Sequence, residues 1–241
     1  MIHRLRIDSF PVDESSNGRS LLANKAPVEA IPISALGVDV SLSTRLSSLA
    51  LILASSSAIR RQMLDAAGIE YEAIASAVDE DAIKRGYSDP VKLTTALAGA
   101  KAQSVSGMSP EHWVIVSDSV ISIEGRLFDK PASREIASEH LRFFSGKTMQ
   151  LTSAVALARG GEVDWVQAES AMLRVRELSG EFIESYLDAE WPEVGYCVGV
   201  FRMEGRGVQL FDAIEGDHFT ILGMPLFPLL GALRERGLLL S

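Results

Sequence analysis

The sequence predicts a single α/β domain with a central mixed, twisted sheet flanked by helices, and three observations lead to this fold class. Segments rich in Val and Ile alternate with segments whose apolar residues recur at helical spacing, an alternation typical of α/β folds. Of the 241 residues, 47% are hydrophobic, which is enough to bury a substantial core. No break in composition divides residues 49–241, so we expect one domain there.

Residues 1–48 have a different character. They contain five basic and five acidic residues, with Pro, Ser, Asn and Gly scattered among them and no sustained periodicity. We therefore predict a flexible N-terminal extension over residues 1–48, although an upstream choice of start codon would also account for it. The formal net charge of −9 then belongs entirely to residues 49–241.

The first half of the domain alternates strands and helices. Short Val- and Ile-rich runs indicate strands, and Ile59, Met63 and Leu64 recur at helical spacing until Gly68 ends the helix. The predicted elements are, in order, a buried strand at 51–54, a serine turn and helix cap at 55–57, a helix up to Gly68, a strand at 71–75, a helix at 91–106, and a strand or hairpin arm at 113–123.

The second half continues the alternation. Ser133 and Ser179 each stand where a helix cap is expected, because a serine side chain can accept a hydrogen bond from a free backbone N–H. The predicted elements are a helix at 133–144, strands near 149–158 and 163–175, a helix at 179–187, strands near 198–203 and 207–214, and a last helix at 224–236.

Composition excludes several classes of protein. An acidic chain has no bulk affinity for nucleic acid or an anionic membrane, and no apolar run approaches the roughly 18–20 residues of a membrane span. The single cysteine, Cys197, excludes an internal disulfide and fits a reducing compartment. We expect a soluble cytoplasmic protein with neither a nucleic-acid nor a membrane partner.

The first candidate site is the serine turn at residues 55–57, followed by Arg60 and Arg61 on a helix. A helix N-terminus has unpaired N–H groups and partial positive charge, so hydroxyls and guanidiniums there would suit a phosphate. The Walker A pattern is absent. The alternative interpretation is a serine cap on a surface helix with two solvated arginines.

Two acidic positions could bind a metal or accept a proton. Asp79, Glu80 and Asp81 follow a predicted strand, and carboxylates of this kind can hold Mg²⁺ together with substrate phosphate; a solvated acidic loop is the alternative. Asp118 lies inside an apolar strand, where an unpaired charge is costly. It therefore needs a cation, a metal or several donors, either as a base or as a structural aspartate that caps a loop.

Two lysines could neutralise phosphate charge. Lys130 precedes Pro131 in a loop before a helix, and Lys101 lies on the predicted 91–106 helix. Each could equally be a solvated surface lysine, so neither position decides the function by itself.

Taken together, these segments resemble the Maf family of nucleoside triphosphate pyrophosphatases over residues 50–238. Six segments match family motifs in order and spacing. They are L-A-S-S-S-A-I-R-R-Q-M-L from Leu53 (family A-S-x-S-P-R-R-x-x-L-L), V-D-E from Val78, A-K-A from Ala100, S-D-S from Ser117 (G-A-D-T or G-S-D-Q), D-K-P from Asp129 (G-K-P), and I-E-G-D with G-M-P-L from Ile214 (I-E-G-D and G-L-P-L).

The resemblance implies a Maf/inosine triphosphatase-like fold with a nucleotide cleft, and hydrolysis between the α- and β-phosphates to a nucleoside monophosphate and pyrophosphate. It assigns Asp118 as the proton acceptor and Glu80 as the second acid. It also implies that both carboxylates bind a divalent metal, Mg²⁺ or Mn²⁺. Lys101 and Lys130 match the basic pair of the family. The implied phosphate-binding positions are Ser55, Ser57 and Arg60.

Departures from the family pattern concern base selection. Ala58 stands where the family usually has Pro, Ile59 where it has the first Arg, and Ser119 where it has Thr or Gln. In the family, the positions of Ile59, Ser119 and Glu204 are linked to the choice of base. The segment V-F-R-M-E-G is similar to G-S-F-K-x-E-G of the 7-methyl-GTP subgroup, with Arg202 in place of Lys as a substrate-binding residue. A carboxylate suits a positively charged methylated guanine.

Two functions remain open from the sequence. The first is a pyrophosphatase for a modified nucleotide such as 7-methyl-GTP. The second, since the family is linked to septum formation, is a nucleotide-binding regulator of cell division with little turnover. The set Glu80, Lys101, Asp118 and Lys130 favours the enzyme, and a homodimer is compatible with either.

Overall fold

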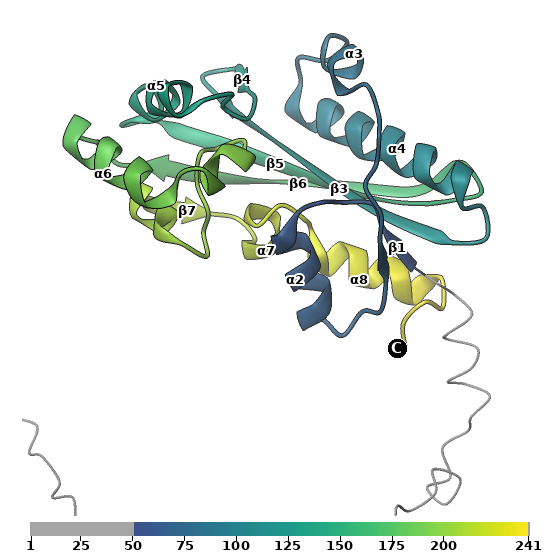
Figure 1. Cartoon of the computed structure of the whole chain (residues 1–241). Coiled ribbons are helices and arrows are strands. Elements are labelled where there is room, and N and C mark those ends of the chain that lie inside the picture. The colour runs from purple at the N-terminus through teal and green to yellow at the C-terminus, as the bar shows by residue number, and fades with distance from the viewer. Residues whose placement is uncertain (1–50, 241) are drawn as a thin grey trace, which may run out of the picture. The chain divides into compact units, whose positions relative to one another are not determined.

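A computed structural model describes residues 51–240, so the extension predicted over residues 1–48 lies outside the described residues. The α/β prediction is confirmed by a seven-stranded sheet with helices on both faces (Figure 1). The strands are β1 (Leu51–Leu53), β2 (Glu72–Ala73), β3 (Trp113–Ile123), β4 (Arg126–Phe128), β5 (Thr148–Arg159), β6 (Glu162–Val175) and β7 (Phe211–Glu215). The helices are α2 (Ala58–Ala66), α3 (Glu80–Lys84), α4 (Pro90–Met108), α5 (Arg134–Phe144), α6 (Gly180–Glu190), α7 (His218–Ile221) and α8 (Leu226–Glu235), with 3₁₀ turns η2 (Glu193–Tyr196) and η3 (Arg206–Leu210).

The sheet is mixed, as predicted. Its order is β2-β1-β3-β5-β6-β7, with β4 paired to β3. β1 runs parallel to β2 and β3, whereas the remaining pairs are antiparallel. The long β5–β6 hairpin pairs from Thr148↔Arg174 to Arg159↔Glu162 and forms the centre of the sheet.

Alternation of side chains along the strands sorts the core into layers. On one face, Val114, Val116 and the alanines of β5 pack against Ala98 and Ala102 of α4. The opposite face carries two groups of helices: α2 and α8 cover Ile115 and its neighbours, and α5 and α6 cover Ile121 and its neighbours. Three small hydroxyl residues of β3 and β5 lie between these two apolar clusters: Ser117, Ser119 and Ser153.

A gap in the sheet exposes one edge of β3. β1 pairs with β3 only as far as Leu53↔Ile115, and β4 begins at Ile121↔Phe128. Between these two partners, residues 116–120 have a neighbouring strand on the β5 side only. Within this gap Asp118 and Ser119 are only partly buried, and their side chains lie on opposite faces of the sheet.

One predicted strand is wrong and another is only partly correct. Residues 198–203 form turns and irregular backbone, because Val200 has a φ of 55°, which no strand permits. Of the strand predicted at 207–214, the first part is η3 and only β7 is extended. The short helices α3 and α7 were not predicted, since four or five residues give no periodic signal.

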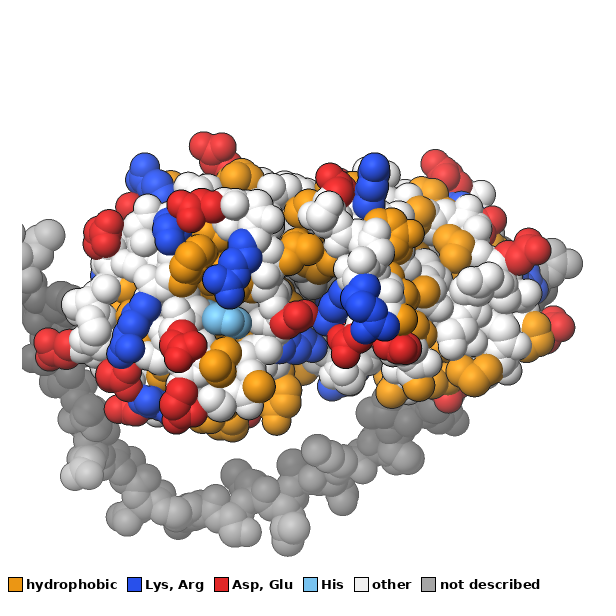
Figure 2. All heavy atoms as spheres, turned by 90° about the horizontal axis from the view of Figure 1, so that it is seen from above, with side chains coloured by type: hydrophobic (Ala, Val, Ile, Leu, Met, Phe, Trp, Pro, Cys, Tyr) orange, Lys and Arg blue, Asp and Glu red, His pale blue; other side chains and the backbone are white. Residues whose placement is uncertain are grey.

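Charged side chains of both signs are mixed over the face that carries α3, α4 and α5 (Figure 2). No broad basic surface is visible on that face, which agrees with the acidic composition. Between residues 51 and 240, no helix has the length and apolar character needed to cross a membrane.

Candidate active site

A single cavity of about 970 Å³ brings together every site residue predicted from the sequence. These residues are Ser55, Ser57, Ile59, Arg60, Glu80, Lys101, Asp118, Ser119, Lys130, Arg202 and Glu204. The side of the cavity formed by β3, α2, α3 and α4 is called the strand wall below. The side formed by residues 193–204 is called the loop wall.

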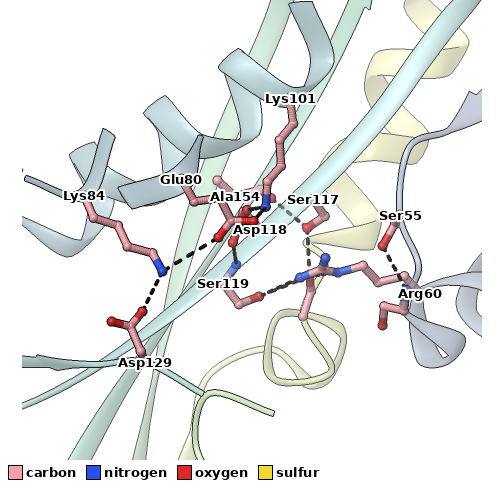
Figure 3. A network of polar contacts seen from close by, with 12 residues as sticks. Ser55, Arg60, Glu80, Lys84, Lys101, Ser117, Asp118, Ser119, Asp129 and Ala154 are labelled. Atoms are coloured by element: carbon pink, nitrogen blue, oxygen red, sulfur yellow. Dashed lines mark hydrogen bonds and ion pairs between the residues drawn. The ribbon is translucent and has the colours of Figure 1, made fainter. Parts of the chain in front are cut away.

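At the strand wall, Lys101 lies between two carboxylates (Figure 3). Its Nζ is 2.7 Å from Glu80 Oε1 and contacts Asp118 Oδ2, while Asp118 Oδ1 accepts the Ser119 N–H at 2.8 Å. The side chains of Lys101 and Asp118 are only 14% and 13% exposed. The strand aspartate thus has the cation and the donor that its apolar surroundings demand.

These contacts set the protonation of Glu80. Desolvation raises the pKa of its carboxyl. The hydrogen bond and charge of Lys101, together with the charges of Lys84 and Lys130, lower this pKa by more than desolvation raises it. The net result is a pKa below the usual range, so Glu80 is an anion at neutral pH.

On the other face of β3, one serine hydroxyl and one backbone carbonyl fix Arg60. Arg60 donates from Nε to Gly223 O at 3.0 Å and from Nη2 to Ser119 Oγ at 3.1 Å. Ser117 Oγ also lies 2.7 Å from Gly223 O. Burial lowers the pKa of Arg60 and the charge of Asp118 opposes this shift, so the guanidinium stays charged.

The serine turn leaves the N-terminus of α2 uncapped by a side chain. Ser57 occupies the N-cap position but makes no side-chain cap hydrogen bond, and its own N–H is donated to Ser55 Oγ at 3.2 Å. The prediction of a serine cap is therefore correct in position but wrong in its hydrogen bond, because no serine side chain accepts from the N–H groups of α2. These first N–H groups of α2 lie at the cavity. Arg61, in contrast, donates to Ser56 O and does not line the cavity.

Lys84 is a cation of the strand wall that the sequence analysis missed. Its Nζ is 2.7 Å from Asp129 Oδ1 and 3.7 Å from Glu80 Oε2, so it links α3 to the loop that carries Lys130 (Figure 3). The i, i+4 spacing from Glu80 would have indicated the pair only if α3 had been recognised as a helix. Lys130 itself is exposed and lines the cavity.

The loop wall contains Arg202, Glu204 and Cys197. Arg202 is paired: its Nη2 lies 3.2 Å from Oε2 of the buried Glu190, which the sequence analysis missed. Burial, and secondarily the charge of Glu204, raise the pKa of Cys197 to about 11, so this residue is a neutral thiol at pH 7. A neutral thiol is a weak nucleophile, so the raised pKa disfavours nucleophilic catalysis by Cys197.

The acidic residues fit a divalent cation only in part. Among residues 51–240, no group of three or more His, Cys, Asp or Glu side chains converges as a metal site. Glu80 and Asp118 nevertheless meet around one cation, the ammonium of Lys101. Two carboxylates suit Mg²⁺ when substrate phosphate supplies further oxygen ligands.

The family model described as Maf-like protein matches residues 50–236, a span that includes all eleven predicted site residues. The chain belongs to the Maf family. The resemblance seen in the six sequence motifs is thereby confirmed.

Curated relatives of this Maf domain are named for hydrolysis of nucleotides. A nucleoside triphosphate pyrophosphatase of Nitrobacter hamburgensis is 47% identical over 191 residues, covering 78% of this chain and 95% of the relative. A 7-methyl-GTP pyrophosphatase of Rhizobium etli is 44% identical over 191 residues, covering 78% and 96%. Among solved structures, a nucleoside-triphosphatase (dITP/XTP pyrophosphatase) of Mycobacterium abscessus matches at a TM-score of 0.35 and 14% identity, over 53% of this chain and 73% of that chain.

Proposed function

We propose that this Maf protein is a nucleoside triphosphate pyrophosphatase that hydrolyses the bond between the α- and β-phosphates. The observation that carries the proposal is the convergence of Asp118, Lys101 and Glu80 beside the open N-terminus of α2 in one cavity. The names of the relatives from Nitrobacter and Rhizobium support the same activity.

In the proposed reaction, Asp118 orients a water and accepts its proton. The carboxylate has acceptor capacity left after its contacts with Lys101 and the Ser119 N–H. The water oxygen forms a bond to the α-phosphorus, the bond from that phosphorus to the bridging oxygen breaks, and pyrophosphate leaves with the electron pair. Lys101 holds the Asp118 carboxylate in place through their ion pair.

Positive charge around the cavity would stabilise the leaving pyrophosphate. Arg60 presents a fixed guanidinium, and Lys130 and Lys84 contribute ammonium groups from the neighbouring loop and helix. The N–H groups at the start of α2, next to Ser55 and Ser57, would bind phosphate oxygens. Preorganised donors of this kind are effective because they need not rearrange as charge develops.

We propose Glu80 and Asp118 as the residues that hold a divalent cation, Mg²⁺ or Mn²⁺, once substrate is bound. The cation would supply charge neutralisation at the phosphate oxygens. Because both carboxylates contact Lys101 in this structure, we expect binding of the metal without nucleotide to be weak.

For the base, we propose that Ile59, Ser119 and Glu204 govern selection and that 7-methyl-GTP is a preferred substrate. Glu204 lines the loop wall, where a carboxylate can accept hydrogen bonds from guanine and attract its methylated, cationic form.

We further propose that residues 49–241 are the catalytic domain and that the protein forms a homodimer. We propose that the enzyme works in the cytoplasm on free nucleotides, without nucleic-acid or membrane partners.

A product assay tests the function. Purified protein is incubated with Mg²⁺ or Mn²⁺ and each of GTP, 7-methyl-GTP, dTTP, UTP and CTP, and products are separated by ion-exchange chromatography. We expect nucleoside monophosphate and pyrophosphate in equal amounts, and loss of turnover when EDTA is added. Nucleoside diphosphate and orthophosphate as products would contradict the proposal, as would tight binding of nucleotide without turnover.

A further inference from the structure

The last turn of α6 buries two polar side chains on one face. Tyr186 and Glu190 are one helical turn apart and only 3% and 6% exposed, next to the apolar Ile183 and Leu187. A carboxylate at such a position is costly unless all its oxygens find donors. The structure shows where these donors come from.

Both side chains hold the same segment, residues 197–206. The Tyr186 hydroxyl donates to Val200 O at 2.9 Å. Glu190 Oε2 accepts from Arg202 Nε at 3.3 Å and from Nη2 at 3.2 Å, and Oε1 accepts the Arg206 N–H at 3.2 Å. Tyr186 and Glu190 together are called the α6 clamp below.

The clamped segment has a conformation that needs such support. Val200 is β-branched and has a φ of 55°, in the left-handed region that such residues avoid. Beyond it, a Cβ at Gly207 would lie 2.4 Å from Arg202 O, so the chain is packed there backbone against backbone. The clamp therefore fixes a segment whose side chains Phe201, Arg202 and Glu204 belong to the loop wall.

The clamp also sets the charge of the loop wall. Glu190 neutralises Arg202, whereas Glu204 makes no ion pair within residues 51–240. Glu193 adds a second carboxylate to this wall, and Cys197 is a neutral thiol. The wall thus has two carboxylates and one guanidinium, and the buried Glu190 makes it more negative by neutralising that guanidinium.

We infer that Glu190 and Tyr186 are positioning residues for nucleotide selectivity: the α6 clamp fixes the 197–206 segment and neutralises Arg202, and so lets Glu204 favour a positively charged base. The inference rests on the proposed function for its substrates. It assigns no contact between the clamp and the nucleotide itself.

The test compares wild type with three variants: E190Q, Y186F and the double variant E190Q/R202M. E181Q serves as the control, because Glu181 lies on the exposed face of the same helix. kcat and KM are measured for 7-methyl-GTP and GTP. In E190Q the freed Arg202 repels a cationic base, so the kcat/KM ratio of 7-methyl-GTP to GTP should fall about tenfold with kcat for GTP changed less than about threefold.

The double variant separates this mechanism from a merely structural role. E190Q/R202M lacks both charges, so its ratio should return to within about threefold of wild type; a loss of folding support alone would lower it further. Y186F should raise KM for both nucleotides with little change in kcat. An unchanged ratio in E190Q, or a ratio in the double variant below that of E190Q, overturns the inference. If E190Q does not fold, a ratio in the double variant more than about threefold below that of wild type overturns the inference.

Calorimetric binding of α,β-methylene GTP and its 7-methyl derivative keeps the two proposals distinguishable. If wild type hydrolyses neither nucleotide but E190Q lowers the binding ratio of these analogues, the proposed function fails and the clamp stands. If hydrolysis occurs and neither ratio changes in E190Q, the clamp fails and the function stands.

Discussion

The two walls of the cavity reach their geometry by different means. The strand wall consists of side chains on regular elements: Asp118 on β3, Lys101 on α4 and Glu80 on α3. The loop wall consists of the 3₁₀ turn η2 and of irregular backbone at residues 197–204, supported from behind by Tyr186 and Glu190 of α6. Ladders of backbone hydrogen bonds fix the first wall, whereas two buried side chains fix the second.

This difference suggests a division of labour. The reaction proposed here is common to all nucleoside triphosphates, and its groups lie on the more rigid wall. Discrimination between bases is proposed for the loop wall, whose backbone has fewer hydrogen-bond ladders to hold it. Substitutions in the strand wall should therefore act on kcat for every nucleotide, and substitutions in the loop wall on the preference among nucleotides.

The largest effect is expected from D118N. An amide in place of the carboxylate cannot accept a proton, so kcat should fall by about 10²–10⁴-fold for every nucleotide, the usual contribution of a general base. Steady-state release of pyrophosphate measures this, with circular dichroism as the control for folding. Full activity in D118N would remove the assigned role and with it the distinction between the walls.

E204Q should change preference rather than rate. Loss of the unpaired carboxylate is expected to lower kcat/KM for 7-methyl-GTP relative to GTP by about tenfold, while kcat for GTP stays near that of wild type. Competition of the two nucleotides in one reaction, followed by chromatography of the monophosphates, gives the ratio directly. A uniform fall for both nucleotides would place Glu204 with the strand-wall residues.

G223A tests how tightly the strand wall is fixed. Gly223 has a φ of +104°, and a Cβ there would lie 3.3 Å from Ser119 Oγ and 3.4 Å from Arg60 Nη2. We expect the free energy of unfolding to fall by about 1–3 kcal/mol, the usual cost of a residue held in such a conformation, with lower affinity for nucleotide. Urea denaturation measures the change. G231A is the matched control, because a Cβ at Gly231 meets nothing within 4 Å.

The smallest effect concerns pH and stability. The pKa of Glu80 is lower in the folded protein than in the unfolded chain, so this carboxylate stabilises the fold above its unfolded pKa and loses that contribution as pH falls through the folded value. For a partly exposed pair we expect about 0.2–1 kcal/mol at pH 7. Urea denaturation of wild type and E80Q from pH 7 to pH 3 should show a difference that disappears at the acid end; a difference that grows there would contradict it.

Strong periodic signals made most of the fold predictable. The Val- and Ile-rich segment that became β3 and the Ser133 cap of α5 both appear as expected, since Ser133 Oγ accepts the Ile136 N–H. The predicted strand at 198–203 failed because tertiary contacts decide this segment. Val198 and Phe201 are apolar enough for a strand, but the contact of Tyr186 with Val200 O holds a turn instead.

The sequence by itself determined the fold class, the family and the eleven candidate side chains, because alternation of apolar residues and short ordered motifs are local properties of the chain. Only the tertiary structure decided how these side chains are paired. It placed Lys101 between Glu80 and Asp118, linked Arg60 to Gly223, and joined Arg202 to Glu190. The physical reason is that burial and ion pairing depend on distances between residues far apart in the chain, which the gap in the sheet and the last turn of α6 bring together.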